Sequence, residues 1–240
     1  MKNAVVTGGT KGIGLAITKM LLSEGYFVVV TYAHDELAAN KTETELRSIS
    51  EHFRIMKADQ SDKIQIKAFA NKLVEELGHI DCLVCNAGST LRKPLEETSD
   101  EEWERVMQVN VNSSVFLIRD FIPFIPENSR IIFIGSLMAV HPHSISLAYG
   151  VTKCAVHALA KNLVKVFEGT GTTVNTIVPG FVETEWQKTK PQEIRNNICK
   201  KTAIHRFATV EEIADAARFC INNAFVNGSE IEVSGGYSFK

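Results

Sequence analysis

The stretch Ala4-Val5-Val6-Thr7-Gly8-Gly9-Thr10-Lys11-Gly12-Ile13-Gly14, close to the N-terminus, decides the fold of this chain. Residues 4–6 form a short apolar run that glycines soon follow, which predicts a buried strand. Residues 13–22 carry apolar side chains at helical spacing and predict a helix. A strand, a glycine-rich turn and a helix start make an anion site, because unpaired helix N–H groups and a backbone without Cβ atoms accept a phosphate. We therefore predict that this turn binds the pyrophosphate of a nucleotide.

The glycine spacing narrows the kind of nucleotide site. Gly8, Gly12 and Gly14 give G-x-x-x-G-x-G, which differs from the G-x-G-x-x-G of many dinucleotide folds. Lys11 is followed by Gly12 and Ile13, so the G-K-[S/T] ending of a P-loop is missing. The turn alone would also suit an ordinary strand–turn–helix connection, so the choice depends on a second motif.

The second motif lies far downstream and suits proton transfer. Ser136 follows the apolar run of residues 131–135, and Tyr149 and Lys153 lie in a predicted helix over residues 147–167. Their i, i+4 spacing places Tyr149 and Lys153 on one helix face. A free tyrosine has a pKa of about 10, and a nearby ammonium or an oxidised nicotinamide favours the phenolate and lowers that pKa. At the carboxyl end of a strand, the Ser136 hydroxyl is placed to hydrogen-bond a substrate oxygen.

Each motif alone has an ordinary explanation, since most Tyr-x-x-x-Lys pairs lie on the surface of an amphipathic helix. The combination of a pyrophosphate site with a tyrosine acid reverses that preference. Together the two motifs predict hydride transfer between a nicotinamide and a carbonyl or alcohol.

The ordered set of motifs resembles that of the short-chain dehydrogenase/reductases over essentially the whole chain. Residues 7–14 match their T-G-x-x-x-G-I-G, and Asn110 matches the helix asparagine of their catalytic tetrad, which Ser136, Tyr149 and Lys153 complete. The remaining matches are Asn86-Ala87-Gly88, Pro179-Gly180 with Glu183-Thr184, and Gly228 with Gly235-Gly236, where Ser234 replaces the usual aspartate.

The resemblance implies a role for each site residue. Tyr149 would be the general acid in reduction, and Ser136 would orient the carbonyl. Lys153 would lower the pKa of Tyr149 and bind the nicotinamide ribose, while Asn110 would hold a water that links Lys153 to solvent. Taken alone, Asn110 is more typical of a residue that caps or interrupts a helix. The expected nucleotide contacts are Gly8, Thr10, Lys11, Gly12, Ile13, Gly14, Tyr32, His34, Asp59, Asn86, Ala87, Gly88, Tyr149, Lys153, Pro179, Gly180, Val182 and Thr184.

The fold class follows from the alternation of strand-like and helical runs. It predicts an α/β protein with a parallel sheet covered by helices on both faces. The resemblance adds a Rossmann-type, doubly wound sheet of seven strands in the order 3-2-1-4-5-6-7. We expect one domain over residues 1–240, with a polar, irregular lid over residues 182–206 before a helix at 210–222. The expected strands are residues 4–6, 27–32, 54–57, 81–85, 130–135, 173–178 and 229–233.

Composition excludes several other classes of protein. With 240 residues, 45% hydrophobic residues and a net charge of −2, the chain is neither disordered nor a nucleic-acid binder. No apolar stretch approaches the roughly 20 residues of a membrane span. Because residue 4 already begins a strand, we expect no signal peptide and a cytoplasmic protein.

Two clusters suggest metal chemistry, and we predict none. Cys82 and Cys85 form a C-x-x-C, but there is no second pair and both lie in an apolar strand. His141 and His143 flank Pro142, with no acidic or cysteine partner nearby in sequence. We interpret this loop as a pocket rim or a plain connection.

The end of the second predicted strand indicates the coenzyme. An acidic residue there would bind the ribose hydroxyls of NAD, yet Thr31 and Tyr32 are not acidic and Asp35 comes later. Lys11 could meet a 2′-phosphate instead, although a solvated loop lysine is the alternative. We therefore predict NADP(H) over NAD(H). By the resemblance, Asp59 would face the adenine amine.

The substrate is less defined by the sequence. Residues 29–33 and 206–214 look most like 3-oxoacyl-[acyl-carrier-protein] reductases, which predicts an NADP(H)-dependent 3-oxoacyl thioester reductase. Glu127 and Thr170 stand where those enzymes commonly have arginines against their acidic carrier protein, so repulsion would weaken that partnership. A sugar, polyol or other small ketone stays open as substrate, and so does a catalytically silent nucleotide sensor. The resemblance also implies a homodimer or homotetramer, with which the apolar residues 115–118 are compatible.

Overall fold

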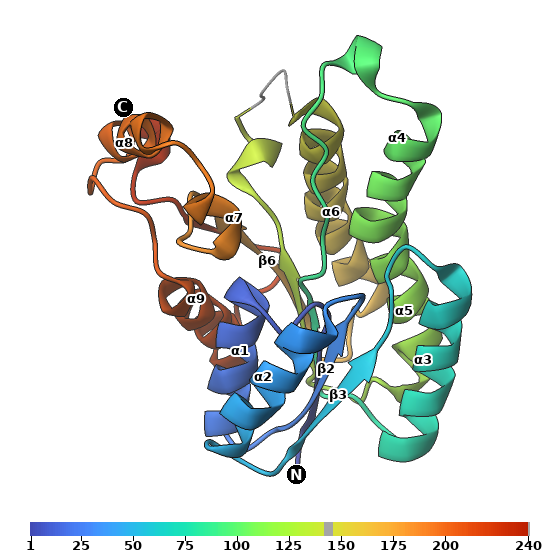
Figure 1. Ribbon diagram of the computed structural model, residues 1–240. Coiled ribbons are helices and arrows are strands. Elements are labelled where there is room, and N and C mark those ends of the chain that lie inside the picture. Colours follow the sequence, from blue (N-terminus) through green and yellow to red (C-terminus); the bar gives the residue numbers. More distant parts are fainter. Residues whose placement is uncertain (142–145, 240) are drawn as a thin grey trace.

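The computed structural model of the protein describes residues 1–141 and 146–239. Its strands are β1 (Asn3–Val6), β2 (Phe27–Tyr32), β3 (Phe53–Lys57), β4 (Cys82–Cys85), β5 (Arg130–Ile134), β6 (Thr173–Pro179) and β7 (Glu230–Val233). Within the described residues these seven strands form one parallel sheet in the order β3-β2-β1-β4-β5-β6-β7 (Figure 1). The predicted strand order is confirmed, and every predicted strand matches to within one residue at each end.

Helices cover both faces of this sheet (Figure 1). They are α1 (Gly12–Ser23), α2 (Glu36–Arg47), α3 (Lys63–Leu77), α4 (Asp100–Met107), α5 (Ser113–Phe121), α6 (Leu147–Val166), α7 (Glu185–Lys188), α8 (Gln192–Lys201) and α9 (Val210–Asn222). Short 3₁₀ turns are η1 (Leu95–Glu97), η3 (Ile122–Phe124), η4 (Leu137–Ala139) and η6 (Tyr237–Phe239), and η2 (Gln108–Asn112) is a π-helical turn. The doubly wound α/β class is therefore confirmed.

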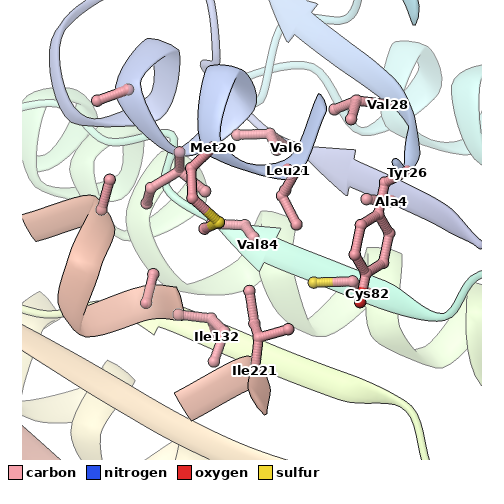
Figure 2. Close-up of a cluster of buried hydrophobic side chains, with 14 of the residues drawn as sticks. Ala4, Val6, Met20, Leu21, Tyr26, Val28, Cys82, Val84, Ile132 and Ile221 are labelled. Atoms are coloured by element: carbon pink, nitrogen blue, oxygen red, sulfur yellow. The ribbon is translucent and has the colours of Figure 1, made fainter. Parts of the chain in front are cut away.

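The apolar core lies in two layers, one on each face of the sheet. Ala4 and Val6 of β1 pack with Leu21 of α1 and Ile221 of α9 (Figure 2). Val5 points the other way, into a second cluster with side chains of α3, α5 and α6. Alternate strand residues thus serve opposite layers, and burial on both faces explains why these strands are continuously apolar.

The turn after β1 lies where the strand order reverses. β1 pairs with β2 on one side and β4 on the other, and open α/β sheets bind ligands outside the carboxyl ends of the strands at this point. The Thr7 N–H donates to the carbonyl of Val84 at 3.0 Å, and the Gly9 N–H donates to that of Thr31 at 3.1 Å. The predicted pyrophosphate turn is therefore fixed at the switch point of the sheet.

Residues 182–206 were predicted to be irregular, and this is wrong, because the segment contains α7 and α8; its role as a lid stays a prediction. The apolar pattern of α8 is too weak to predict a helix, since Ile198 is its one buried residue. Tertiary contacts compensate for that weakness. Arg195 donates to Glu183 at 2.5 Å and lies 4.5 Å from the ring centre of Phe207.

The structure also bears on two classes that the sequence analysis did not expect, membrane spans and metal sites. Among the described residues, no helix is both long and apolar enough to cross a membrane, and no cluster of His, Cys, Asp and Glu has the arrangement of a metal site. Cys82 and Cys85 are free thiols, and burial raises the pKa of each to about 12. Pro142 and His143 lie outside the described residues.

Candidate active site

The glycine turn is shaped to receive a ligand at the N-terminus of α1. Gly8 and Gly12 adopt φ values of +62° and +51°, which residues other than glycine rarely adopt. Lys11 precedes the helix, and no side chain caps its first N–H groups. These free donors and the positive end of the helix dipole suit a pyrophosphate, so the residues present fit a dinucleotide.

Asn86 fastens this turn to the end of β4. Its Nδ2 donates to the carbonyl oxygens of Thr7 and Gly8, both at 2.9 Å. In return, the backbone N–H groups of Asn86 and Ala87 donate to the Thr7 hydroxyl at 3.0 Å. The N-A-G sequence therefore has a structural role that pairs it with Thr7, a partnership that sequence spacing did not reveal.

Gly14→Ala is expected to weaken NADPH binding by at least about tenfold and to destabilise the fold by about 1–3 kcal/mol, the usual cost of overpacking. A Cβ on Gly14 would lie 2.5 Å from both the Gly8 carbonyl oxygen and Asn86 Nδ2, so the turn must open. Gly25→Ala is the control for nucleotide binding, because a Cβ there meets nothing within 4 Å; its φ of +81° should lower stability and leave NADPH binding unchanged. Fluorescence titration with NADPH and urea unfolding measure the two effects. Unchanged binding by Gly14→Ala would contradict this account of the turn.

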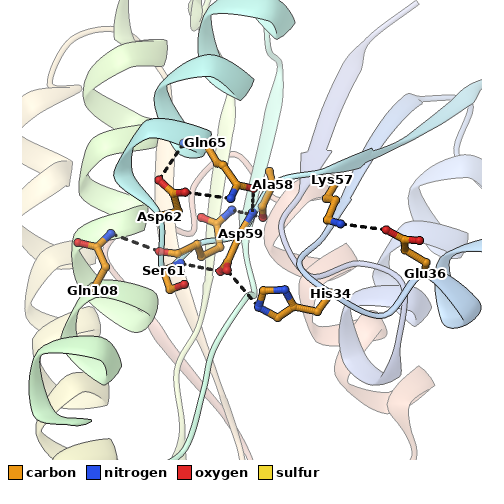
Figure 3. Close-up of polar contacts among 10 residues, drawn as sticks. His34, Glu36, Lys57, Ala58, Asp59, Ser61, Asp62, Gln65 and Gln108 are labelled. Atoms are coloured by element: carbon orange, nitrogen blue, oxygen red, sulfur yellow. Dashed lines mark hydrogen bonds and ion pairs between the residues drawn. The ribbon is translucent and has the colours of Figure 1, made fainter. Parts of the chain in front are cut away.

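The adenosine end of the site carries paired charges. Lys11, predicted to meet a 2′-phosphate, is ion-paired with Asp35, and this contact lowers the pKa of the Asp35 carboxyl. Asp59 accepts from the Ser61 N–H at 2.8 Å and contacts His34 at 3.0 Å (Figure 3). Asp35 comes too late in sequence for the usual acidic position, yet the fold returns it to Lys11. Asp35 therefore partly neutralises the positive charge of Lys11, which was expected to meet a 2′-phosphate.

A cavity of about 610 Å³ joins the glycine turn to the predicted catalytic group. Every predicted site residue lines it except Thr10, Gly14, His34 and Asn110. Gly14 instead lies under the Asn86 amide, and Asn110 is buried next to the cavity. The two distant motifs of the sequence therefore meet in one place.

Lys153 is buried and points toward Tyr149. Its Nζ lies 5.6 Å from the centre of the Tyr149 ring and donates to the carbonyl of Ile134 at 2.7 Å. Burial lowers the pKa of Lys153 to about 8. An ammonium whose pKa is this close to neutral pH can exchange a proton near physiological pH.

Tyr149 differs from expectation in its acidity. Without a nucleotide, burial raises the pKa of Tyr149, and this outweighs the hydrogen bond from Ser136 and the charge of Arg92, which both lower it. We expected Lys153 and the nicotinamide to lower the pKa. In the protein without a bound nucleotide, Tyr149 is a protonated phenol, which is the form that a general acid needs for reduction.

Asn110 lies on the π-helical turn η2 between α4 and α5. Its Nδ2 donates to the Ser89 carbonyl and to the Thr152 hydroxyl, both at 2.9 Å, while its Oδ1 accepts from the Ser89 N–H at 2.7 Å. These bonds hold the loop after β4 against α6 next to Lys153. Single-turn π-bulges often occur at functional sites, because they displace a residue from the regular helical pattern.

His157 supports Ser136 from behind and was missed by sequence reasoning. Its Nε2 lies 3.5 Å from the Ser136 N–H, and its Nδ1 lies 3.1 Å from Glu230. Burial lowers the pKa of His157, although the Glu230 carboxylate opposes this effect. The neutral ring with its proton on Nδ1 satisfies both contacts. Only the pairing of β6 with β7 brings Glu230 here, so no local signal predicts it.

Comparison with known proteins agrees with this geometry. Residues 8–238 match the sequence pattern of the family described as enoyl-(acyl carrier protein) reductase. A short-chain dehydrogenase/reductase of Arabidopsis thaliana is 31% identical, covering 98% of this chain and 94% of the relative. A 3-oxoacyl-[acyl-carrier-protein] reductase of Staphylococcus aureus is 28% identical over 98% and 97%. A 2-dehydro-3-deoxy-D-gluconate 5-dehydrogenase of Pseudoalteromonas atlantica is 30% identical over 98% and 95%.

Solved structures show the same relationship. A short-chain dehydrogenase/reductase from Serratia marcescens superposes with a TM-score of 0.93 at 30% identity, covering 99% of this chain and 98% of the other. A blue fluorescent protein from a metagenomic library, in complex with NADPH, gives 0.92 at 28% identity over 99% and 98%. Likeness of sequence and fold over nearly the full length of both chains identifies this protein as a member of the short-chain dehydrogenase/reductase family of oxidoreductases.

Proposed function

We propose that the protein reduces a ketone with NADP(H), and that Tyr149 supplies the proton. The observation that carries this proposal is the single cavity in which Tyr149, Ser136 and Lys153 lie beside the glycine turn. The bound nicotinamide would supply a hydride to the carbonyl carbon. The Tyr149 hydroxyl then gives its proton to the carbonyl oxygen, which completes a secondary alcohol.

The other residues of the site would prepare this transfer. The Ser136 hydroxyl hydrogen-bonds the carbonyl oxygen and aligns it with Tyr149. Lys153 binds the nicotinamide ribose and returns a proton to Tyr149, for which a pKa of about 8 is suitable. Asn110 acts as a positioning residue. Its side chain is already committed to Ser89 and Thr152, so we assign it the placement of the loop beside Lys153 and of any proton-carrying water there.

NADP(H) is proposed as the coenzyme. No acidic side chain ends β2 at Tyr32, and Lys11 lines the adenosine end of the cavity. The NADPH complex of a 28% identical protein supports the same choice. Asp35 opposes it by pairing with Lys11, so we expect a moderate rather than absolute preference over NADH.

A 3-oxoacyl thioester is the first candidate substrate, supported by the likeness to the reductase of Staphylococcus aureus. The surface of this protein that would meet a carrier protein favours a thioester without a carrier protein, such as a coenzyme A thioester. Glu127 and Thr170 lie close together, because the N–H of Asn128 donates to the Thr170 carbonyl at 2.9 Å. A carboxylate at that place repels an acidic carrier protein.

A small polar ketone is the second candidate, favoured by the polar groups around Tyr149. Thr90, Arg92 and Gln187 line the same cavity, and an acyl chain would leave them without partners. The 30% identity to a sugar-acid dehydrogenase points the same way.

Oligomers are common in this family. We propose that the exposed apolar side chains Val115 of α5 and Val151 of α6 belong to a homodimer or homotetramer interface.

Oxidation of NADPH, followed by its absorbance, is expected with at least one of two substrate groups, acetoacetyl-coenzyme A or a panel of sugar and polyol ketones. NADH should support slower turnover, because it has no 2′-phosphate to meet Lys11. Thioester turnover would favour the first candidate, and turnover of small ketones alone would favour the second. Failure of both groups with both nucleotides would contradict the proposed function.

A further inference from the structure

We propose that the substrate of this site carries an anionic group, a carboxylate or a phosphate, and that Arg92 binds it in the cavity. This inference rests on the proposed ketone reduction and adds the charge of the molecule reduced. It concerns a cation that the predicted catalytic group does not use.

Arg92 lies on the loop between β4 and η1 and lines the same cavity as Ser136 and Tyr149. The positive charge of Arg92 favours the ionised form of the Tyr149 hydroxyl, although burial outweighs this effect and raises the pKa of Tyr149. A group bound by Arg92 would therefore lie in the same cavity as the carbonyl that Tyr149 would protonate.

The other charged side chains of this cavity are already engaged. Lys11 pairs with Asp35, Asp59 lies 3.0 Å from His34, and Glu185 lies 2.5 Å from Lys188. Lys153 donates to the Ile134 carbonyl. Among residues 1–141 and 146–239, no carboxylate lies within ion-pair distance of Arg92. A guanidinium left open beside a reacting centre is suited to a carboxylate or phosphate, which it can bind through two parallel hydrogen bonds.

Gln187 indicates what else the substrate offers. Its Oε1 is buried without a hydrogen-bond partner, and the residue lines the cavity. Turning the amide over would leave Nε2 in the same position, so in either orientation a polar atom needs a partner. Because that atom is buried, a substrate hydroxyl reaches it only when the Gln187 side chain turns toward the cavity. The combination favours a hydroxylated keto acid or keto phosphate over a simple acyl chain, whose groups next to the ketone are uncharged.

The test compares ketones that differ in charge and little else. Three pairs serve: acetoacetate with ethyl acetoacetate, 5-keto-D-gluconate with D-fructose, and dihydroxyacetone phosphate with dihydroxyacetone. We expect kcat/KM with NADPH to be about 10- to 100-fold higher for the anionic member of at least one pair, the usual worth of a charge-assisted hydrogen bond. The preferred pair distinguishes a carboxylate from a phosphate.

Arg92→Gln should remove most of that ratio, mainly through KM, and Arg92→Lys should restore part of it. Lys93→Gln is the matched control, because Lys93 is the adjacent cation but pairs with Glu102 at 2.6 Å and does not line the cavity. It should leave the ratio unchanged. The dissociation constant of NADPH, measured for each variant, separates substrate binding from loss of the fold.

Two results would overturn the inference. If neutral and anionic ketones react equally well, or if Arg92→Gln keeps the wild-type ratio, the site does not select an anion and ketone reduction itself still stands. If no ketone is reduced with either nucleotide, the proposed function fails and this inference fails with it.

Discussion

Tyr149→Phe is expected to lower kcat for ketone reduction by about 10²- to 10⁴-fold, the range that positioned acids contribute. The substitution removes one oxygen and with it the proton donor. It leaves the ring in its place on α6 and leaves the glycine turn untouched, so NADPH should bind with a dissociation constant within about threefold of wild type. Steady-state kinetics and NADPH fluorescence titration measure the two quantities.

Tyr26→Phe is the matched control for this prediction. Tyr26 belongs to the apolar cluster of β1 and α1, and burial raises the pKa of its hydroxyl to about 12. Its loss should leave kcat unchanged. A Tyr149→Phe protein that reduces ketones at the wild-type rate would remove Tyr149 from the mechanism. A wild-type protein that binds NADPH but reduces nothing would indicate a nucleotide sensor instead.

Lys153→Met is expected to abolish turnover and yet to stabilise the protein at pH 7 by about 2 kcal/mol. Burial lowers the pKa of Lys153 from 10.5 to about 8, which corresponds to about 3 kcal/mol of destabilisation when the ammonium is charged. Methionine removes that charge and has a similar shape. The loss of the hydrogen bond to the Ile134 carbonyl returns about 1 kcal/mol. Urea unfolding without nucleotide measures the difference.

The pH dependence of this effect has a defined sign. Below pH 8, Lys153 is charged in both the folded and the unfolded chain, so the full cost is present. Between pH 8 and 10.5 the unfolded chain binds more protons, and the wild-type protein gains stability relative to Lys153→Met as the pH rises. The advantage of the variant should therefore shrink over this interval.

Lys165→Met is the control for Lys153→Met, because Lys165 lies on the same helix but is exposed and paired with Glu168. It should change stability little at any pH. If Lys153→Met is less stable than the wild type at pH 7, the buried ammonium is not the strained group described above. We expect the buried ammonium of Lys153 to be retained for function although it destabilises the fold.

The sequence predicted what depends on local pattern. Strands buried on both faces are continuous apolar runs, so their positions came out to within one residue. The glycine turn and the Tyr149–Lys153 pair each have fixed spacing within one element, and the structure brings them to one cavity. The strand order, by contrast, came from the resemblance, because periodicity does not distinguish one parallel order from another.

What the sequence did not reveal depends on contacts between distant segments. Glu230 reaches His157 only because β7 joins the sheet beside β6, and Asp35 reaches Lys11 only because α2 begins next to the glycine turn. The helix α8 buries a single residue, so its amphipathic pattern is faint. The pKa of Tyr149 rises because burial outweighs its charged neighbours, a balance that spacing cannot give.

The central claim is that this cavity transfers a hydride to a ketone while Tyr149 protonates the oxygen. The most direct test supplies NADPH that carries deuterium at the transferring position of C4 and analyses the alcohol formed from each reactive ketone by mass spectrometry. The account predicts one deuterium on the carbinol carbon with the wild-type protein, and a loss of labelled product with Tyr149→Phe. Tight NADPH binding with no label in any alcohol, or equal labelling by both proteins, would contradict it.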